Sequence, residues 1–204
     1  LLGYGFGRDD RIDSAAGNGV PEAAYFGMSR FVMTIVIPSN ALVILSGPAS
    51  SGKSTFAARH FRPSQIVSSD ACRDMVSDDA ADQACSGDAF AILHAIVRAR
   101  LKRRRLTVVD STALSADSRS GLRKIAEEFG APVVVLFFDV SEMTCLMRNE
   151  QRARRVPPEV VRRQCAQARQ AAERISAEGY FRVYLLSPRD IDQASVQVGR
   201  GPTG

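Results

Sequence analysis

Short runs of apolar residues recur along the chain, and each has the length of a buried strand. We predict strands over residues 33–37, 42–45, 65–67, 106–109, 133–138 and 181–186. Val, Ile and Leu fill most of these positions without alternating with polar residues, which is typical of strands buried on both faces. The pattern therefore predicts a parallel sheet.

The stretches between these strands carry apolar residues at helical spacing. We predict helices over residues 52–61, 88–103, 116–129, 141–151 and 158–177. In the second helix, four residues recur at intervals that predict one buried face: Phe90, Leu93, Val97 and Leu101. Strands that alternate with helices predict an α/β fold, with helices on both faces of the sheet. Ligands of such sheets bind beyond the carboxyl ends of the strands.

The N-terminal part of the chain differs in composition from the rest. Residues 1–32 are rich in glycine, show little apolar periodicity and begin without methionine, so we predict a flexible extension there. We expect one folded domain over residues 33–198 and a short tail over residues 199–204. The sequence shows no internal repeat and no second domain.

Composition narrows the class of protein. The 204 residues are 45% hydrophobic and 24% charged, as in ordinary globular domains. The apolar run over residues 31–45 is interrupted by Pro38-Ser39-Asn40, and it is shorter than the roughly 20 residues of a membrane span. No signal-peptide cleavage site accompanies it, so we expect a cytoplasmic protein without a membrane partner.

The four cysteines show no spacing of metal ligands, and we expect them to be reduced thiols packed as small apolar side chains: Cys72, Cys85, Cys145 and Cys165. The net charge of +5 would suit a nucleic-acid partner, but it comes from 24 arginines against three lysines, so charge alone is a weak argument. His60 and His94 have no partners in catalytic spacing.

A basic cluster over residues 98–105 ends the helix predicted over residues 88–103. Cations at a helix C-terminus stabilise the helix dipole, and this account suffices for the cluster. A footprint for a polynucleotide is the alternative.

The strongest chemical signal is a glycine-rich turn between a predicted strand and a predicted helix. The segment Gly47-Pro48-Ala49-Ser50-Ser51-Gly52-Lys53-Ser54 matches the pattern G-x-x-x-x-G-K-[ST]. In such a loop, backbone N–H groups and the helix N-terminus face phosphate oxygens. We predict that this segment and Thr55 bind ATP, with Lys53 on the β- and γ-phosphates and Ser54 on Mg²⁺. The alternative is a chance match, against which the strand and helix on either side argue.

Phosphoryl transfer to a hydroxyl needs a group that accepts the hydroxyl proton. Asp70 follows the strand predicted over residues 65–67, so it would reach the same sheet edge as the glycine-rich turn, and we predict that it is the general base. Arg73 would lie one helical turn away, where its planar guanidinium could bind a phosphate of the acceptor. The same spacing also makes an ordinary ion pair on a helix surface.

Asp110 ends the strand predicted over residues 106–109, at the same edge of the sheet. It could bind Mg²⁺ through water, or it could cap the turn that follows. The sequence leaves both interpretations open.

Arg148 and Arg152 are spaced i, i+4 and would share one helix face. We predict that they belong to a helical lid that clamps the donor phosphates and neutralises transition-state charge. The alternative is a solvated basic surface, which we prefer for three further arginines of this region: Arg154, Arg162 and Arg163.

Together these segments resemble a known family, the kinase domain of bacterial polynucleotide kinase-phosphatase, an RNA end-healing enzyme. The likeness runs from about residue 33 to residue 187 and includes the segments ILSGPASSGKSTFA, IVSSDACRDMVSDD, LTVVD, RNEQR and EGYFRVYLLSP. It implies a P-loop NTPase fold with a helical lid. It also implies transfer of the γ-phosphate of ATP or another nucleoside triphosphate to the 5′-hydroxyl of RNA or DNA.

Carried over by motif, the resemblance gives the residues proposed above the same roles, and makes Arg73 a contact to a phosphate of the acceptor strand. Many relatives read D-x-T-N after the third strand, whereas this chain has Asp110-Ser111-Thr112-Ala113. The phosphatase and ligase modules that accompany the domain in that enzyme are absent from this sequence. We therefore expect either a stand-alone kinase or a piece of a larger enzyme with such modules as partners.

Two other functions stay open at this point. One is a P-loop kinase of a small-molecule hydroxyl on a sugar, nucleoside or antibiotic, and the other is a nucleotide-dependent binding module without transferase activity. Arg73 argues against the first, because a neutral sugar offers it no phosphate. Asp70 argues against the second, because a binding module needs no base for a hydroxyl.

Overall fold

A computed structural model of the chain describes residues 32–199. Contacts divide the chain into two units, Leu1–Phe31 and Val32–Gly204. Apart from Val32, the extension predicted over residues 1–32 lies outside the described residues. The tail predicted over residues 199–204 does so apart from Gly199.

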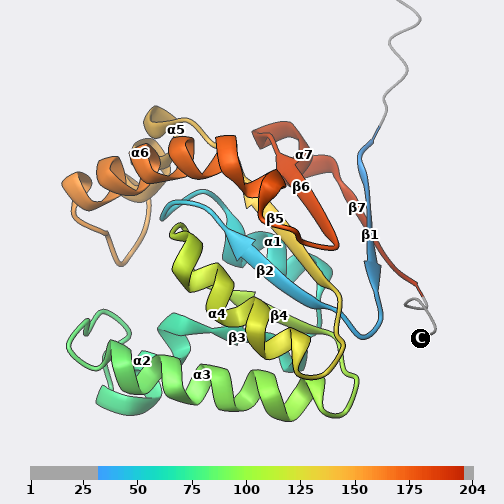
Figure 1. The fold of residues 1–204 in the computed structure, drawn as a ribbon. Coiled ribbons are helices and arrows are strands. Elements are labelled where there is room, and N and C mark those ends of the chain that lie inside the picture. The colour runs from blue at the N-terminus through green and yellow to red at the C-terminus, as the bar shows by residue number, and fades with distance from the viewer. Residues whose placement is uncertain (1–31, 200–204) are drawn as a thin grey trace, which may run out of the picture. The chain divides into compact units, whose positions relative to one another are not determined.

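Five parallel strands form the main sheet, in the order β3-β4-β2-β5-β6 (Figure 1). They are β2 (Leu42–Ser46), β3 (Ile66–Ser68), β4 (Thr107–Asp110), β5 (Val133–Phe138) and β6 (Arg182–Leu186). Every residue of the three central strands β4, β2 and β5 is buried. The prediction of parallel strands buried on both faces is therefore confirmed.

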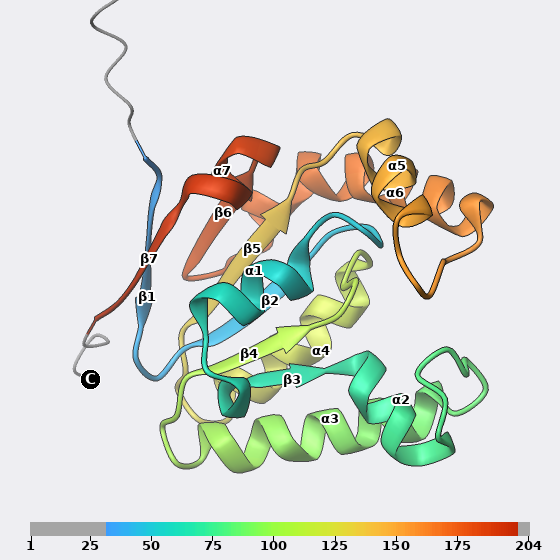
Figure 2. The same cartoon turned by 180° about the vertical axis from the view of Figure 1, so that it is seen from behind.

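Helices cover both faces of this sheet. They are α1 (Lys53–His60), α2 (Ser69–Ser77), α3 (Ser86–Leu101), α4 (Ala116–Glu127), α5 (Glu142–Glu150), α6 (Pro158–Arg174) and α7 (Pro188–Gln193), with 3₁₀ turns η2 (Pro63–Gln65) and η3 (Ile175–Ala177). Figures 1 and 2 show α3 and α4 on one face and α1 on the other. Each face has its own apolar cluster, and α6 packs into both, through Val161 and Cys165 at one end and Ala168 and Ala171 at the other.

A second sheet consists of two parallel strands, β1 (Thr34–Pro38) and β7 (Ser195–Gly199). The hydroxyl of Tyr184 in β6 joins it to the main sheet by accepting a hydrogen bond from the Val36 N–H, at 3.0 Å. Neither β7 nor α7 is predicted from the sequence. No residue of β7 is fully buried, so the strand lacks the apolar run of a central strand. It also carries the fold one residue past the predicted domain end at 198.

Two details of the helices differ from the sequence predictions. Phe90 is 37% exposed, and Ala89 completes the buried face of α3 with Leu93, Val97 and Leu101. Helical spacing places Phe90 on the side of Val97, seven residues on, yet the Phe90 side chain is exposed near the N-terminal end of α3. Helix α2 was not predicted as an element.

All four cysteines are free, and Cys85 alone among them is half-buried rather than buried. Among the described residues, no helix is both long enough and apolar enough to cross a membrane. The parallel arrangement brings the ends of β2, β3 and β4 to one edge of the sheet, where the predicted site residues follow them.

Candidate active site

The loop between β2 and α1 is shaped by its glycines. A side chain at Gly47 would place its Cβ 2.8 Å from the Cβ of Phe138 in β5, so only glycine fits there. Gly52 has a φ of +105°, a conformation that other residues rarely adopt. The loop therefore turns tightly into the N-terminus of α1, as a phosphate-binding loop requires.

Lys53 is only 8% exposed and bends back over this loop. Its Nζ donates hydrogen bonds to the carbonyls of Gly47 and Pro48, at 2.9 and 2.7 Å. Burial lowers the pKa of Lys53 to about 8, although the nearby carboxylate of Asp110 opposes this shift. A buried ammonium without a full counter-charge is suited to attract the phosphates of a nucleotide.

Asp110 lies beside the P-loop, at the end of a strand that pairs with β2. It is 8% exposed, and burial raises its pKa, while a hydrogen bond from Ser54 and the charge of Lys53 act in the opposite direction. No hydrogen bond among the described residues joins its carboxylate to the backbone of the following turn, as capping would require. The sequence left two interpretations of Asp110 open, a ligand of Mg²⁺ and a cap of the following turn. The hydrogen bonds of the described residues do not support the cap, so the metal ligand stays the prediction.

Ser54 and Asp110 offer oxygen ligands, which Mg²⁺ prefers, and Mg²⁺ commonly completes its shell with water and substrate phosphates. In the part of the chain that the structure describes, no group of three or more His, Cys, Asp or Glu residues could hold a metal ion. The pair therefore fits a Mg²⁺ ion that arrives with a nucleotide.

Arg148 and Arg152 lie over the P-loop from the end of α5. The Nη1 of Arg148 donates to the carbonyl of Ser51 at 3.1 Å, and the Nη1 of Arg152 donates to the Oγ of Ser50 at 3.4 Å. The structure thus brings both predicted lid arginines to the loop that would hold the donor. Their roles in transfer stay predictions.

The segment over residues 148–156, which we call the lid segment, is held by a residue that the sequence reasoning missed. Asn149 is 3% exposed, donates to the carbonyl of Val156 at 2.7 Å and accepts its N–H at 3.0 Å. Gln164 of α6, also missed, accepts the N–H of Ala49 at 2.8 Å. Both side chains satisfy buried or half-buried backbone groups, and an apolar residue at either position would leave such groups unpaired.

Asp70 lies in the first turn of α2, which follows β3 directly, and Ser68 caps the helix by accepting the N–H of Ala71. The Asp70 side chain is 46% exposed and forms ion pairs with Arg73 and Arg154. Its charge acts on both Lys53 and Asp110, so it belongs to the same cluster as the P-loop.

The pair of Asp70 and Arg73 has the i, i+3 spacing of an ordinary helix ion pair. Unlike a surface arginine, however, the side chain of Arg73 is only 10% exposed, and its Nε donates to the carbonyl of Ala80 at 3.1 Å. Arg73 thus contacts both the loop between α2 and α3 and the carboxylate of Asp70.

Arg154 is exposed, as predicted, and it also makes a contact that the sequence did not predict. It was predicted to be part of a solvated surface, but its Nη2 lies 2.6 Å from the Oδ2 of Asp70. The arginine bias of the chain concealed it, because 84 residues separate the two and no local pattern links them. Arg162 and Arg163 are exposed, as predicted.

The loop after β4 explains how the chain accommodates its departure from D-x-T-N. Ala113 has a φ of +40°, in the left-handed region where asparagine is tolerated better than alanine. Its carbonyl accepts hydrogen bonds from the Oγ of Ser46 and the Nη1 of Arg119, both at 2.9 Å. These contacts hold the loop against the P-loop strand despite the unfavourable residue.

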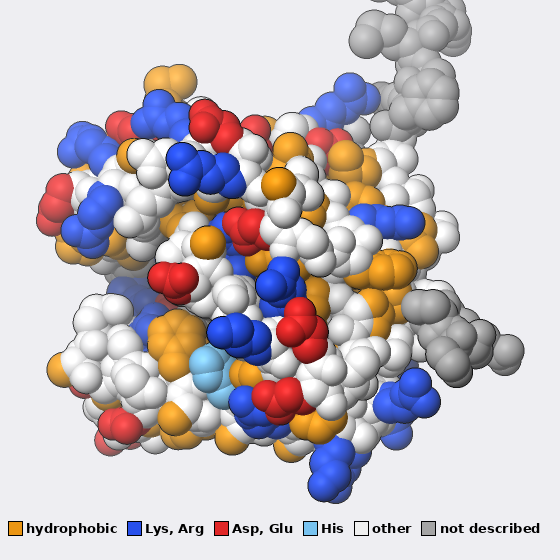
Figure 3. Space-filling view, viewed as in Figure 1, with side chains coloured by type: hydrophobic (Ala, Val, Ile, Leu, Met, Phe, Trp, Pro, Cys, Tyr) orange, Lys and Arg blue, Asp and Glu red, His pale blue; other side chains and the backbone are white. Residues whose placement is uncertain are grey.

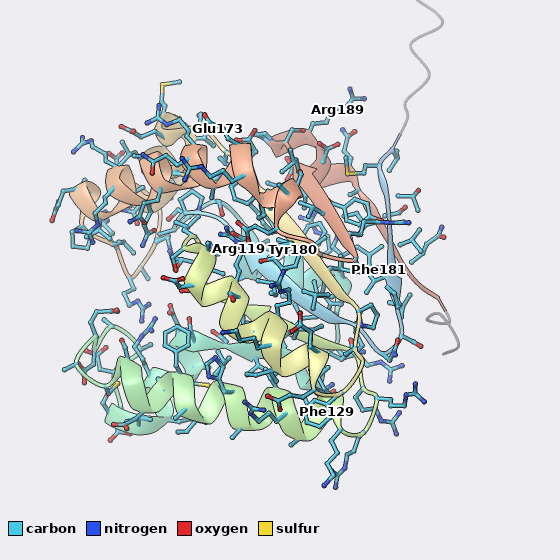
Figure 4. All side chains as sticks on the ribbon, viewed as in Figure 1. Arg119, Phe129, Glu173, Tyr180, Phe181 and Arg189 are labelled. Carbon is cyan, nitrogen blue, oxygen red and sulfur yellow. The ribbon has the colours of Figure 1, made fainter. Side chains whose placement is uncertain are left out.

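Arg119, also missed from the sequence, is 1% exposed and anchors this loop from α4. It forms a two-pronged ion pair with Glu178, whose carboxylate also accepts the hydroxyl of Tyr180 at 2.7 Å. Figure 4 shows Arg119 and Tyr180 side by side. A bidentate pair of this kind has a fixed geometry. Arg119 therefore holds the loop that follows Asp110 in one position, through its hydrogen bond to the carbonyl of Ala113.

Comparisons with known proteins concern the family and the fold of the chain. A search of curated proteins finds no match. Among solved structures, the chain is similar to one in the Pnkp1/Rnl/Hen1 RNA repair complex, with 25% identity and a TM-score of 0.58 over 68% of this chain and 46% of that one. The chain thus spans less than half the length of that relative. The resemblance stated from the sequence is confirmed as a similarity.

Two further structures are similar at lower identity, and the first of them shares the fold. A chain in the AvrRxo1-ORF1:-ORF2 complex with ATP is 16% identical with a TM-score of 0.55, over 74% of this chain and 55% of that one. A gluconokinase from Sinorhizobium meliloti 1021 is 21% identical with a TM-score of 0.45, over 74% and 83%.

The model of a protein family described as AAA domain matches residues 42–175, from the start of β2 to the first residue of η3. This segment includes the P-loop, Asp70, Asp110 and the whole lid segment. Because the match covers more than half of the 204 residues, the chain belongs to this AAA domain family and has the nucleotide-binding fold of a P-loop kinase.

Proposed function

We propose that the protein transfers the γ-phosphate of ATP, or of another nucleoside triphosphate, to the 5′-hydroxyl end of RNA or DNA, as in nucleic-acid end healing. The observation that carries the proposal is the pairing of Asp70 with Arg73 and Arg154 beside an intact P-loop. The carboxylate of Asp70 can accept the proton of the hydroxyl, and the guanidiniums of Arg73 and Arg154 can bind a phosphate of the acceptor. Similarity to a chain in an RNA repair complex supports the same acceptor.

On the donor side, the loop N–H groups and Lys53 would bind the β- and γ-phosphates, and the carbonyls of Gly47 and Pro48 would release the Lys53 ammonium to them. Arg148 and Arg152 would neutralise charge on the transferred group. Mg²⁺ held by Ser54 and, through water, by Asp110 would supply further neutralisation of the phosphate oxygens.

On the acceptor side, Asp70 would take the proton of the 5′-hydroxyl. The oxygen then bonds to the γ-phosphorus while the bond from that phosphorus to the β,γ-bridging oxygen breaks, which leaves the nucleoside diphosphate. Arg73 and Arg154 would exchange part of their contact with Asp70 for a phosphate of the acceptor strand. That exchange would also free the carboxylate for its role as base.

A small-molecule kinase is the second candidate, and one observation favours it. The Nε and Nη2 of Arg73 are already engaged by Ala80 and Asp70, which leaves less of the guanidinium for an acceptor phosphate. A binding module without transferase activity is a third alternative, and the position of Asp70 argues against it.

Phosphoryl transfer from γ-labelled ATP distinguishes these candidates. The acceptors are a 5′-hydroxyl oligonucleotide, a nucleoside 3′-phosphate and a panel of sugars, and the variants are Asp70→Ala and Arg73→Ala. We expect label on the oligonucleotide, and a loss of roughly 10²–10⁴-fold in rate for Asp70→Ala, the usual contribution of a general base. Arg163→Ala removes an exposed arginine and serves as the matched control.

Label on a sugar but not on the oligonucleotide would favour the second candidate. Label on no acceptor, with ATP bound normally, would favour the third. Unchanged transfer by Asp70→Ala would contradict the proposed mechanism whichever acceptor is used.

A further inference from the structure

A second basic region lies at the opposite edge of the sheet from the P-loop. A hollow of about 630 Å³ opens near the C-terminal ends of α1 and α3, where Ser39 and Leu106 precede β2 and β4. Five arginines line it: Arg59, Arg62, Arg100, Arg104 and Arg105. Figure 3 shows Lys and Arg side chains gathered at the end of α3.

These arginines have no acidic partner in the described part of the chain. No Asp or Glu lines the hollow, and none of the five arginines forms an ion pair with a described residue. The two helix C-termini together supply about one negative charge, which is too little to balance five guanidiniums. The helix dipole therefore does not account for the whole cluster.

One group inside the hollow indicates an unmet need for an anion. Burial and the neighbouring charge of Arg105 lower the pKa of Arg100, as crowded positive charges do. A bound anion would relieve this crowding.

The hollow recognises phosphate better than it recognises a base. Its two aromatic side chains are already engaged, because the ring of His60 packs on Phe56 with centroids 4.3 Å apart and Phe61 is 5% exposed. No stacking platform for a nucleobase is thus free at this place, whereas guanidiniums arrive from two separate segments, residues 59–62 and 100–105. Such a surface binds a repeating phosphate backbone without regard to sequence.

We propose that this hollow binds the phosphodiester backbone of the acceptor strand, away from the end that receives the phosphate. The proposal rests on the proposed function, since it takes the acceptor to be a polynucleotide. The five residues of β2 separate the two edges by about 15 Å, which corresponds to about five nucleotides at roughly 3.4 Å each. Only an acceptor longer than this reaches both sites.

The test compares a dinucleotide with an acceptor of about 20 nucleotides, using the full chain. The double variant Arg104→Glu/Arg105→Glu is matched with Lys102→Glu/Arg103→Glu, which makes the same charge change in the same turn at residues that do not line the hollow. Binding of a fluorescent long strand is measured by anisotropy over a range of salt. Transfer to the dinucleotide is measured in parallel.

We expect the hollow variant to bind the long strand at least about tenfold more weakly, with a salt slope smaller by about 1.4, the value for two lost contacts to a single strand. The control should change both quantities much less, and dinucleotide transfer reports the transfer site alone. Arg62→Glu, from another segment, should reduce the slope by about 0.7 and replaces the double variant if that does not fold.

Equal loss in the hollow variant and the control, or no loss in either, would overturn the inference. So would a hollow variant that retains the long strand but no longer binds inorganic tripolyphosphate, because the hollow would then be a site for a small polyanion. Absence of transfer to the dinucleotide by the wild type contradicts the proposed function instead, and the anisotropy measurement separates the two failures.

Discussion

The donor half and the acceptor half of the site are built in different ways. In the donor half, Lys53 is 8% exposed and is bound by two carbonyls of its own loop. In the acceptor half, Asp70 is 46% exposed and is held by side chains from α2 and from the lid segment, 84 residues away. The core of the proposed donor site is thus one contiguous motif, whereas the proposed acceptor site is assembled from segments that only the folded chain brings together.

After the Asp70→Ala variant described above, the largest expected effect lies in the donor half. Lys53→Met removes the buried ammonium while keeping the length of the side chain. We expect transfer to fall by roughly 10²–10³-fold, the usual loss of one group that stabilises transition-state charge. The measurement is single-turnover transfer at saturating ATP, with binding of the acceptor alone as the control. A loss confined to acceptor binding would break the division into halves.

A smaller effect is expected from Arg154→Ala in the acceptor half. The KM for the oligonucleotide should rise about tenfold, the lower end for a hydrogen bond to a charged group, because the pair is half-exposed. The KM for ATP should not change. Arg163→Ala, which removes an exposed arginine from α6, is the control. Equal effects on both KM values would contradict this assignment, and a rise in the KM for ATP alone would show that Arg154 acts on the donor only.

The pKa of Lys53 predicts a pH dependence for the donor half alone. Burial lowers this pKa to about 8, and bound phosphates favour the charged ammonium, so ATP binding above pH 8 should take up a proton. ATP affinity should be roughly constant below that pH and fall about tenfold between pH 7 and pH 9. Calorimetry in buffers of different ionisation enthalpy measures how many protons are taken up when ATP binds. An affinity that is flat across this range, or that Lys53→Met leaves equally pH-dependent, would contradict the assignment.

The smallest effect concerns Ala113, at the junction of the halves. Ala113→Gly removes the steric cost of a positive φ, about 1–2 kcal/mol, and adds the entropy of glycine, about 0.5–1 kcal/mol. We expect the free energy of unfolding to rise by about 0.5 kcal/mol, measured by denaturant unfolding. Ala116→Gly, at the first position of α4, should lower it instead. A destabilised Ala113→Gly variant would show that packing of the Ala113 methyl group stabilises the fold by more than the positive φ costs.

The sequence predicted the parts of the molecule whose signals are local. All five strands of the main sheet follow from apolar runs, and the P-loop follows from spacing alone. Arg148 and Arg152 were predicted to approach the P-loop together from their i, i+4 spacing, and they do so although α5 ends at Glu150 and Arg152 lies beyond the helix. Strand β7 was missed because an exposed strand outside the main sheet carries no apolar run.

The side chains that position the site were missed for a different reason. Asn149 and Gln164 pair with backbone groups of distant segments, and Arg119 becomes informative only when Glu178 is seen beside it. In a chain with 24 arginines, nothing local separates Arg154 from its exposed neighbours. Such contacts are specified by how the sheet brings segments together, which no spacing rule encodes.

The lid segment touches both halves, because Arg148 and Arg152 contact the P-loop and Arg154 contacts Asp70. Two hydrogen bonds between the side chain of Asn149 and the backbone of Val156 hold together the segment that carries these three arginines. In the proposed reaction, the two substrates would therefore be thermodynamically linked. The factor by which bound ATP changes the affinity for the acceptor would equal the factor by which the bound acceptor changes the affinity for ATP. The nine consecutive residues of the lid segment would carry this coupling.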